Sequence, residues 1–270
     1  MAGTAPSSRR WLCLEWPEPW PGDINQVANP AARRLLARAA ATEFRPLLVR
    51  GTEPIAGSRV FLADTSPPAA TATVTRIERP EQYDDLVRPD PDGPLPGEPV
   101  TRPLLLVCTH EQRDPCCGLE GRALVEAIAG PDVFACSHLG GHRFAPTGMV
   151  LPTGYVYGRL DVAAAAAIRA RAAASEVETD RCRGRCTWSP GGQVAELALR
   201  AATGLSTPDA FIMINQTGDT VHLNSTSGGR WAIDLERVDL DVTRPASCGA
   251  RPTLVVPLRA AALRTLRGSR

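Results

Sequence analysis

The sequence contains no lysine, so arginine supplies all 30 of its basic side chains other than histidine. This absence excludes Schiff-base chemistry and the phosphate-binding lysine of P-loop proteins. The net charge is also small, because 29 acidic residues leave a formal charge of +1 and an isoelectric point near 7.6. Neither nucleic acid nor an anionic membrane is therefore expected as a partner.

Long apolar runs are missing as well. No N-terminal stretch has the charged, apolar and small-residue order of a secretory signal, and no apolar run approaches the roughly 18 residues of a membrane span. We therefore expect a soluble, cytoplasmic protein. In that compartment the eight cysteines are expected to be reduced thiols or metal ligands rather than structural disulfides.

Reactive side chains concentrate between residues 108 and 142. An apolar run over 103–108 predicts a strand, 119–130 has helical spacing, and 132–137 predicts a second strand. In such a β-α-β unit the strands run parallel, so the loops that follow them emerge at the same edge of the sheet. The side chains expected to converge there are Cys108, Cys117, His138 and His142.

The two histidines are separated by a leucine and two adjacent glycines, which predict a loop rather than a helix. Glycine lets the backbone approach a bulky ligand and allows both imidazoles to be aimed at one centre. An H-x3-H pair that faces two thiols indicates metal ligation. Cys108 and Cys117 have eight residues between them, wider than the spacing of a zinc finger, yet zinc stays open.

These residues also carry a family resemblance. CTHEQRDPCCG (108–118), followed by SHLGGHRFAPTGMVLPTGYVYGRLD (137–161), resembles the signature of the sucrase/ferredoxin-like family, which are thioredoxin-like 2Fe-2S proteins. The resemblance extends to RRWLCLEWPEPW, RCRGRCTWSPGGQVAELALR and ASCG, and so covers most of the chain. It implies a thioredoxin-like ferredoxin fold and a 2Fe-2S cluster as the cofactor.

The resemblance places the metal and cofactor ligands on Cys108, Cys117, His138 and His142. Cys116 could instead supply the second thiolate. Cys117 is preferred because it directly precedes Gly118, as in the family's R-D-x-x-C-G pattern. The arginine and aspartate of that pattern are expected either to support the ligands or to form a surface ion pair of little energetic value.

Two thiolates and two neutral imidazoles around an oxidised 2Fe-2S core leave a neutral centre, which is easier to reduce than a four-thiolate centre. The same replacement in Rieske sites raises the potential by roughly 250 mV or more. A helix that begins near Leu119 would favour the thiolate of Cys117 through its positive end. We therefore expect an electron carrier or redox sensor rather than a stand-alone enzyme, with an unidentified redox protein as donor or acceptor.

The fold expected is α/β, with two β-α-β-β-β-α halves and a C-terminal α+β extension. Residues 1–100 are expected to form a half without cluster ligands, which ends in a proline-rich linker (89–99). Residues 101–178 are expected to form the half with the cluster site, and residues 179–270 a helix and a β-meander. An arginine-rich tail is expected to be helical. Cys13, which has no partner in the first half, is interpreted as a small buried hydrophobe.

Other cysteines and other functions stay open. Cys182 and Cys186 lie among arginines, so they are either a redox pair with a lowered pKa or incidental to an arginine-rich loop. Cys136 and Cys248 are expected to be structural. The alternative functions are a thioredoxin-type thiol-disulfide protein, disfavoured because no Cys-x-x-Cys follows the strand, and a zinc-stabilised binding module. No paired carboxylates indicate glycoside hydrolysis.

Overall fold

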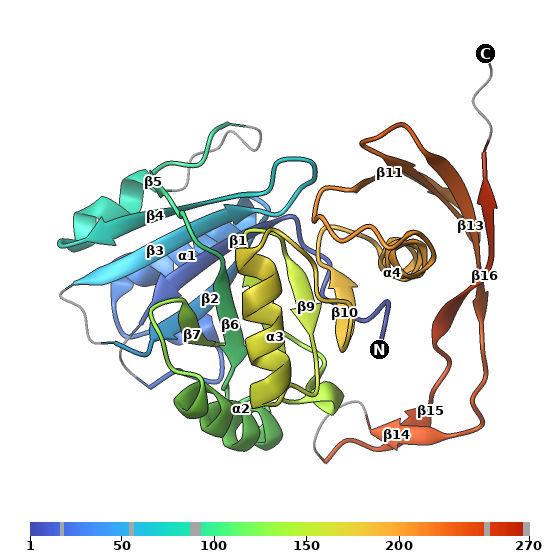
Figure 1. Ribbon diagram of the computed structural model, residues 1–270. Coiled ribbons are helices and arrows are strands. Elements are labelled where there is room, and N and C mark those ends of the chain that lie inside the picture. Colours follow the sequence, from blue (N-terminus) through green and yellow to red (C-terminus); the bar gives the residue numbers. More distant parts are fainter. Residues whose placement is uncertain (17–18, 54–56, 87–92, 246–248, 267–270) are drawn as a thin grey trace.

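The computed structural model describes residues 1–16, 19–53, 57–86, 93–245 and 249–266. Its main feature is a ten-stranded mixed sheet with the order β10-β9-β8-β6-β7-β2-β1-β3-β4-β5. A four-stranded antiparallel sheet with the order β11-β12-β13-β16 lies beside it (Figure 1). The mixed α/β class that the sequence predicts is therefore confirmed.

The first half of the large sheet has a helix between its first two strands. Its elements are β1 (Arg10–Glu15), α1 (Pro30–Ala41), β2 (Phe44–Gly51), β3 (Ser58–Asp64), β4 (Thr71–Ile77), a 3-10 helix (Pro80–Asp85) and β5 (Glu98–Pro99). β1 is the central strand, because it pairs parallel with β2 and antiparallel with β3. Part of the proline-rich linker lies outside the described residues, and its end forms β5 against β4.

The second half repeats this order. Its elements are β6 (Leu104–Cys108), α2 (Pro115–Ala127), β7 (Val133–Cys136), β8 (Gly148–Leu151), β9 (Tyr155–Tyr157) and α3 (Val162–Ala173). β6 is central, with β7 parallel on one side and β8 antiparallel on the other. The pairing of β2 with β7 joins the two halves into one sheet, and β10 (Cys182–Arg185) extends that sheet at the edge beside β9. The same sheet therefore contains strands from before residue 100 and from after residue 178.

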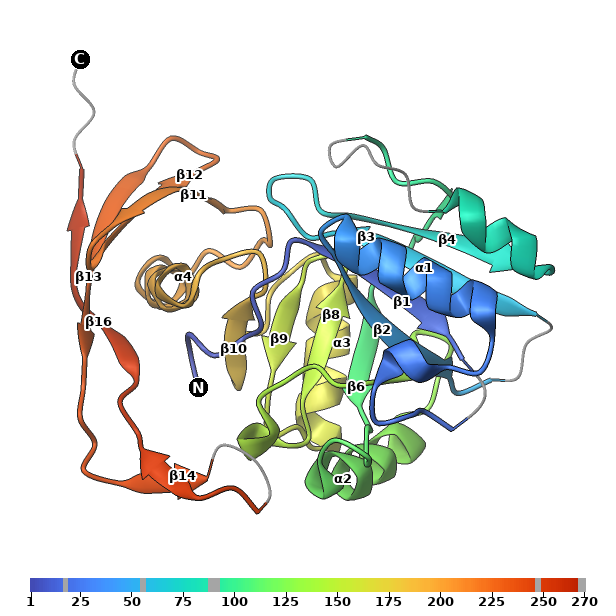
Figure 2. The ribbon, with the colours of Figure 1, turned by 180° about the vertical axis from the view of Figure 1, so that it is seen from behind.

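Alternation along the central strands divides the core in two. Leu12 of β1 packs with α1, while Leu105 and Val107 of β6 pack with α2 and α3, so the helices cover one face of the sheet. Trp11 and Cys108 belong to the core on the other face, where the sheet curls onto itself. Figure 2 shows α1 from its outer side. This second core includes Cys13, which is buried as predicted.

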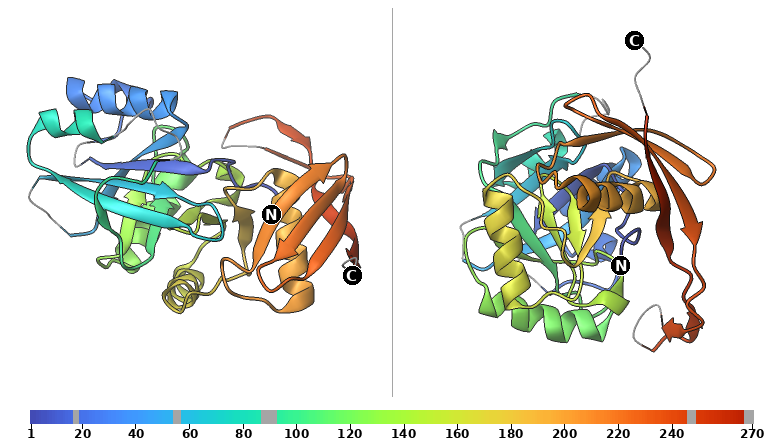
Figure 3. Two further views of the ribbon diagram at one scale, coloured as in Figure 1. Left: turned by 90° about the horizontal axis from the view of Figure 1, so that it is seen from above. Right: turned by 45° about the vertical axis from the view of Figure 1, so that its right-hand side comes forward.

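The C-terminal part forms its own layer. α4 (Pro190–Thr203) lies against the four-stranded sheet, whose strands are β11 (Phe211–Thr217), β12 (Thr220–Ser225), β13 (Arg230–Arg237) and β16 (Leu258–Thr265); a hairpin of β14 (Thr243–Pro245) and β15 (Pro252–Leu254) precedes β16. Figure 3 shows this layer beside the large sheet. The helical tail predicted from the sequence is wrong, because residues 258–265 pair with β13 and that pairing overrides the helix propensity of its alanines and leucines.

A buried polar network ties α4 to the large sheet. Glu196 is fully buried and accepts hydrogen bonds from Trp188 Nε1 at 2.8 Å, from Arg200 Nη2 at 2.9 Å and from the hydroxyl of Tyr155 in β9. Every oxygen of this carboxylate is satisfied, so the network is structural. Within the described ranges, no helix combines the length and the apolar character needed to cross a bilayer.

Candidate metal centre

Cys108 occupies the end of the central strand β6. It lies opposite Cys136 in the register between β6 and β7, and its side chain is 1 % exposed. The side chains of Cys117 and His138 and the backbone N–H groups of His110 and Leu139 act on the thiol of Cys108 and lower its pKa well below its ordinary value. Such contacts favour a thiolate over a thiol at this position.

Cys117 lies in the first turn of α2. Asp114 caps this helix: its Oδ1 accepts from the N–H groups of Cys116 at 3.0 Å and of Cys117 at 3.3 Å. α2 therefore begins at Pro115, before the position that helical spacing predicts. Gly121 explains how the helix fits, because a Cβ there would lie 2.1 Å from the carbonyl oxygen of Cys108.

The histidine loop depends on its two glycines. Gly140 and Gly141 have φ values of 88° and 79°, the left-handed region that favours glycine. A Cβ on Gly141 would also lie 2.2 Å from the guanidinium of Arg183. The turn stacks the rings of His138 and His142 with their centroids 4.1 Å apart and their planes 16° apart.

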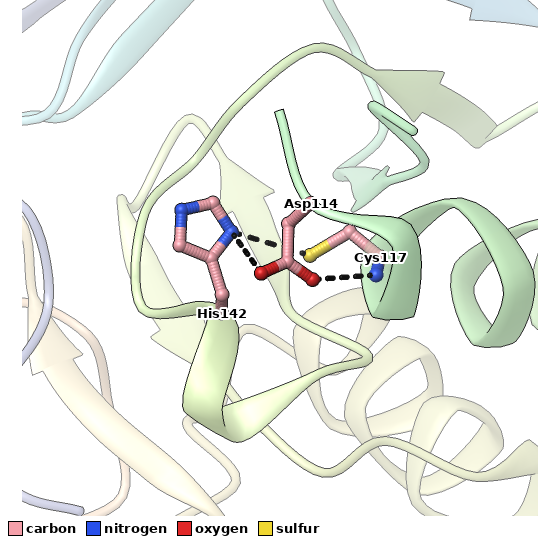
Figure 4. Close-up of side chains that lie close together, drawn as sticks. All are labelled: Asp114, Cys117 and His142. Carbon is pink, nitrogen blue, oxygen red and sulfur yellow. Dashed lines mark hydrogen bonds and ion pairs between the residues drawn. The ribbon is translucent and has the colours of Figure 1, made fainter. Parts of the chain in front are cut away.

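The four side chains form a closed set of contacts. Cys108 interacts with Cys117 and His138, the two imidazoles stack, and His142 Nδ1 lies 3.7 Å from Cys117 Sγ. Figure 4 shows the side chains of Cys117 and His142 facing each other. In addition, His138 Nδ1 is buried and has no hydrogen-bond partner among the described residues. The structure thus brings all four sequence-predicted residues together, while their role as ligands stays a prediction.

The two thiols act on each other's pKa in opposite directions. Their hydrogen bond lowers the pKa of Cys108 well below its ordinary value and raises the pKa of Cys117. The expectation that the helix end lowers the pKa of Cys117 is therefore wrong, since the contact with Cys108 outweighs the helix dipole. Burial lowers the pKa of His142, which favours the neutral imidazole that a metal binds.

Asp114 offers one more donor than the sequence interpretation assigned. Its Oδ2 lies 3.6 Å from His142 Nδ1, and its side chain is 1 % exposed (Figure 4). Asp114, Cys117 and His142 have potential ligand atoms within 4.8 Å of one another. The available signal was an aspartate directly before a proline, which is typical of a helix N-cap and not of a surface ion pair.

Cys116 does not share the position of Cys117. It is disulfide-bonded, so the expectation of reduced cysteines is wrong for this residue. Cys117, in contrast, is a free thiol whose sulfur faces His142. Of the two adjacent cysteines, the geometry favours Cys117 as the donor; Cys248 lies outside the described residues.

Arg183 supports the histidine loop from behind, a role that the sequence interpretation missed. Its side chain is almost completely buried and donates to the carbonyl oxygens of Gly140, at 2.9 Å, and of Thr4. Its guanidinium also lies 5.4 Å from the ring centre of Phe144. Burial lowers the pKa of Arg183 to about 10, so the group keeps its positive charge beside the site at neutral pH.

Cys182 and Cys186 do not form a redox pair. β10 shifts register against β9 between Cys182 and Gly184, and the two sulfurs enter different cores. Burial raises the pKa of Cys182 to about 12 and also raises that of Cys186, which accepts a hydrogen bond from Trp11 Nε1 at 3.2 Å. The interpretation as thiols with a lowered pKa is therefore wrong.

Comparison with known proteins adds a family and one relative. A family model described as sucrase/ferredoxin-like matches residues 1–184. Altered inheritance of mitochondria protein 32 from Eremothecium gossypii is 47 % identical over 60 residues, which make up 20 % of this chain and 19 % of that relative. The chain thus matches about a fifth of that relative's length. No solved structure gave a significant match.

Proposed function

This chain belongs to the sucrase/ferredoxin-like family, and from that premise we propose that it is an iron-sulfur protein that transfers electrons or senses redox state. In this proposal Cys108, Cys117, His138 and His142 hold a 2Fe-2S cluster, and the β-α-β-β-β-α halves are thioredoxin-like. The observation that supports it is the closed set of contacts among these four side chains.

The donor set fits such a cluster. Thiolates and imidazoles are the ligands of Rieske-type centres, in which histidines replace two of the four cysteines. His138 Nδ1 is buried without a hydrogen-bond partner in the described structure, and a buried polar atom of this kind requires one. When bound, the cluster supplies a site that accepts and returns a single electron.

The surrounding residues have definable tasks in this proposal. The N–H groups of His110 and Leu139 favour the thiolate of Cys108, and donors that stabilise negative charge on a ligand sulfur raise the reduction potential. Arg183 places a positive charge behind the loop and holds Gly140 in position. These features favour the reduced state, in which the site gains negative charge.

A zinc-binding module is the second candidate, because Asp114, Cys117 and His142 offer oxygen, sulfur and nitrogen donors to one centre. A thiol-disulfide protein that uses Cys108 and Cys117 is the third. Anaerobic purification followed by iron, sulfide and zinc analysis and a visible spectrum separates the three. The proposal expects a coloured protein with about two iron and two sulfide per chain. A colourless protein, with or without zinc, would refute it.

A further inference from the structure

The exposed surface around His142 carries positive charge on both of its sides. Arg143 directly follows His142, and Arg113 directly precedes the capping residue Asp114, whose carboxylate approaches the imidazole. Arg113 is close enough to His142 to act on it electrostatically. Both arginine side chains are exposed, whereas the side chain of His142 is 15 % exposed, so the edge of the ring reaches the surface between cations.

A third exposed arginine lies beside the same ring system. Arg159 donates its backbone N–H to the carbonyl of Phe144 at 2.7 Å, which fixes it next to the histidine loop. Three guanidinium groups surround the ring of Phe144, at 4.8 Å for Arg143, 5.9 Å for Arg159 and 5.4 Å for the buried Arg183. Like charges gathered this closely repel one another, so the cluster gains stability from an anionic counterpart.

Asp114 is the one carboxylate of the described residues that the structure places against the His142 ring, and it is buried, whereas the three arginines are exposed. Arg113, Arg143 and Arg159 form no ion pair in the part of the chain that the structure describes. Asp161, which follows shortly after Arg159, is held by Arg181 at 2.8 Å. The positive charge of these three arginines is therefore available to a binding partner. Many arginines elsewhere in the described structure instead form ion pairs with aspartate or glutamate side chains.

We propose that the edge of His142, framed by Arg113, Arg143 and Arg159, is the docking face for an electron-transfer protein with an acidic surface. This inference rests on the proposed function and names the partner of the same site. Opposite charges guide two proteins into contact and raise the association rate, while the small contact areas typical of redox encounters allow rapid release. In the docked state one electron leaves the partner and enters this protein at the partly exposed edge of His142.

A labelled plant-type ferredoxin, which is small and acidic, serves as the probe. Its binding to the iron-containing protein is followed by fluorescence anisotropy, and we expect the Kd to rise about tenfold or more between ionic strengths of about 10 mM and 200 mM. The double variant R143E/R159E should raise the low-salt Kd by about tenfold or more. The control R237E, an exposed arginine of β13 far along the chain, should leave it within about twofold.

Stopped-flow reduction by the same ferredoxin gives the second readout. The reduced ferredoxin loses one electron and the oxidised protein gains it, a direction that the higher potential expected for two histidine ligands permits. The rate constant should fall about tenfold in R143E/R159E and stay unchanged in R237E. Equal binding and rates for all three proteins would overturn the docking face.

Two further outcomes separate the possible failures. The first outcome is that R143E/R159E changes the rate of reduction by dithionite, a small anion, but leaves the Kd for ferredoxin unchanged. The patch would then serve a small anion, and the protein docking face would be refuted. The iron content of the purified proteins separates a failure of the proposed function from a failure of the docking face. An iron-free wild-type protein refutes the proposed function itself, whereas a normal iron content in R143E/R159E together with weaker ferredoxin binding supports the docking face.

Discussion

The two halves of the large sheet have the same topology but different chemistry at the end of the central strand. β1 and β6 each lie between a parallel and an antiparallel neighbour, and each is followed by a helix with proline in its first turn. Asn29 caps α1 as Asp114 caps α2, through a side-chain oxygen that accepts two backbone N–H groups. The framework is therefore set by apolar alternation and helix caps.

Glu15 ends β1, and Arg59 satisfies its carboxylate with two hydrogen bonds of 2.7 and 2.8 Å. Cys108 ends β6 among thiols and imidazoles, where His138 Nδ1 has no partner in the described structure. At the end of β1 a carboxylate is satisfied by an ion pair, while the end of β6 gathers sulfur and nitrogen atoms that could bind a metal, one of which has no hydrogen-bond partner in the described structure. The same topology therefore carries different chemistry in its two halves, and in the proposed function only the second half holds the cofactor.

The largest effect is expected from removing sulfur at the second strand end. Cys117→Ser should abolish the visible chromophore and the bound iron, because serine oxygen replaces a thiolate ligand poorly. Cys116→Ser is the matched control, since its disulfide-bonded sulfur is not available to the site, and it should keep both. Iron analysis and absorption spectra compare the two. Loss of the chromophore only in Cys116→Ser would reverse the assignment.

A change of ligand type should alter the potential while keeping the cluster. His142→Cys adds a thiolate and therefore negative charge, so the reduction potential should fall by on the order of 100 mV or more. Potentiometric titration followed by visible absorption measures the shift. An unchanged spectrum and potential would show that this imidazole is not a ligand.

The sequence predicted the framework and the four converging side chains, because strand runs, a glycine-ended helix and an H-x3-H loop are local signals. It placed the start of α2 too late. Gly118 and Gly121 lower the helix propensity of this segment. The need for a glycine at position 121 is evident only in the folded structure, where Gly121 packs against the carbonyl of Cys108. Asp114 was underestimated for the same reason, since its contact with His142 depends on a loop distant in sequence.

The pair Cys182 and Cys186 shows a second limit. On a regular strand, residues four apart lie on the same face, which would have brought the sulfurs together. The register shift between β9 and β10 sends them to opposite cores. Neither this irregularity nor the pairing of residues 258–265 with β13 has a local signal, because both depend on partner strands that lie elsewhere in the chain.

Breaking the ion pair of the first half should cost stability without affecting the metal. Arg59→Met keeps much of the packing against Phe61 and Phe134 but leaves the largely buried carboxylate of Glu15 without its cation. Unfolding by denaturant should show a loss of about 2 to 4 kcal/mol. Iron content per folded chain should stay the same, and the double variant E15Q/R59M should recover part of the loss. A drop in iron content would show that the two strand ends are coupled.

The smallest effects on stability are expected at the N-caps of α1 and α2, where equivalent residues of the two halves can be compared directly. Asn29→Ala and Asp114→Ala should each cost about 1 kcal/mol of unfolding free energy, because each leaves backbone N–H groups of a first helical turn without an acceptor. Only Asp114→Ala should also raise the reduction potential, since the buried carboxylate beside His142 opposes the gain of an electron. Parallel denaturation curves and potentiometric titrations of the two variants measure this difference. Equal potentials in both would mean that Asp114 is a cap and nothing more, and the second half would then differ from the first only in its thiols and imidazoles.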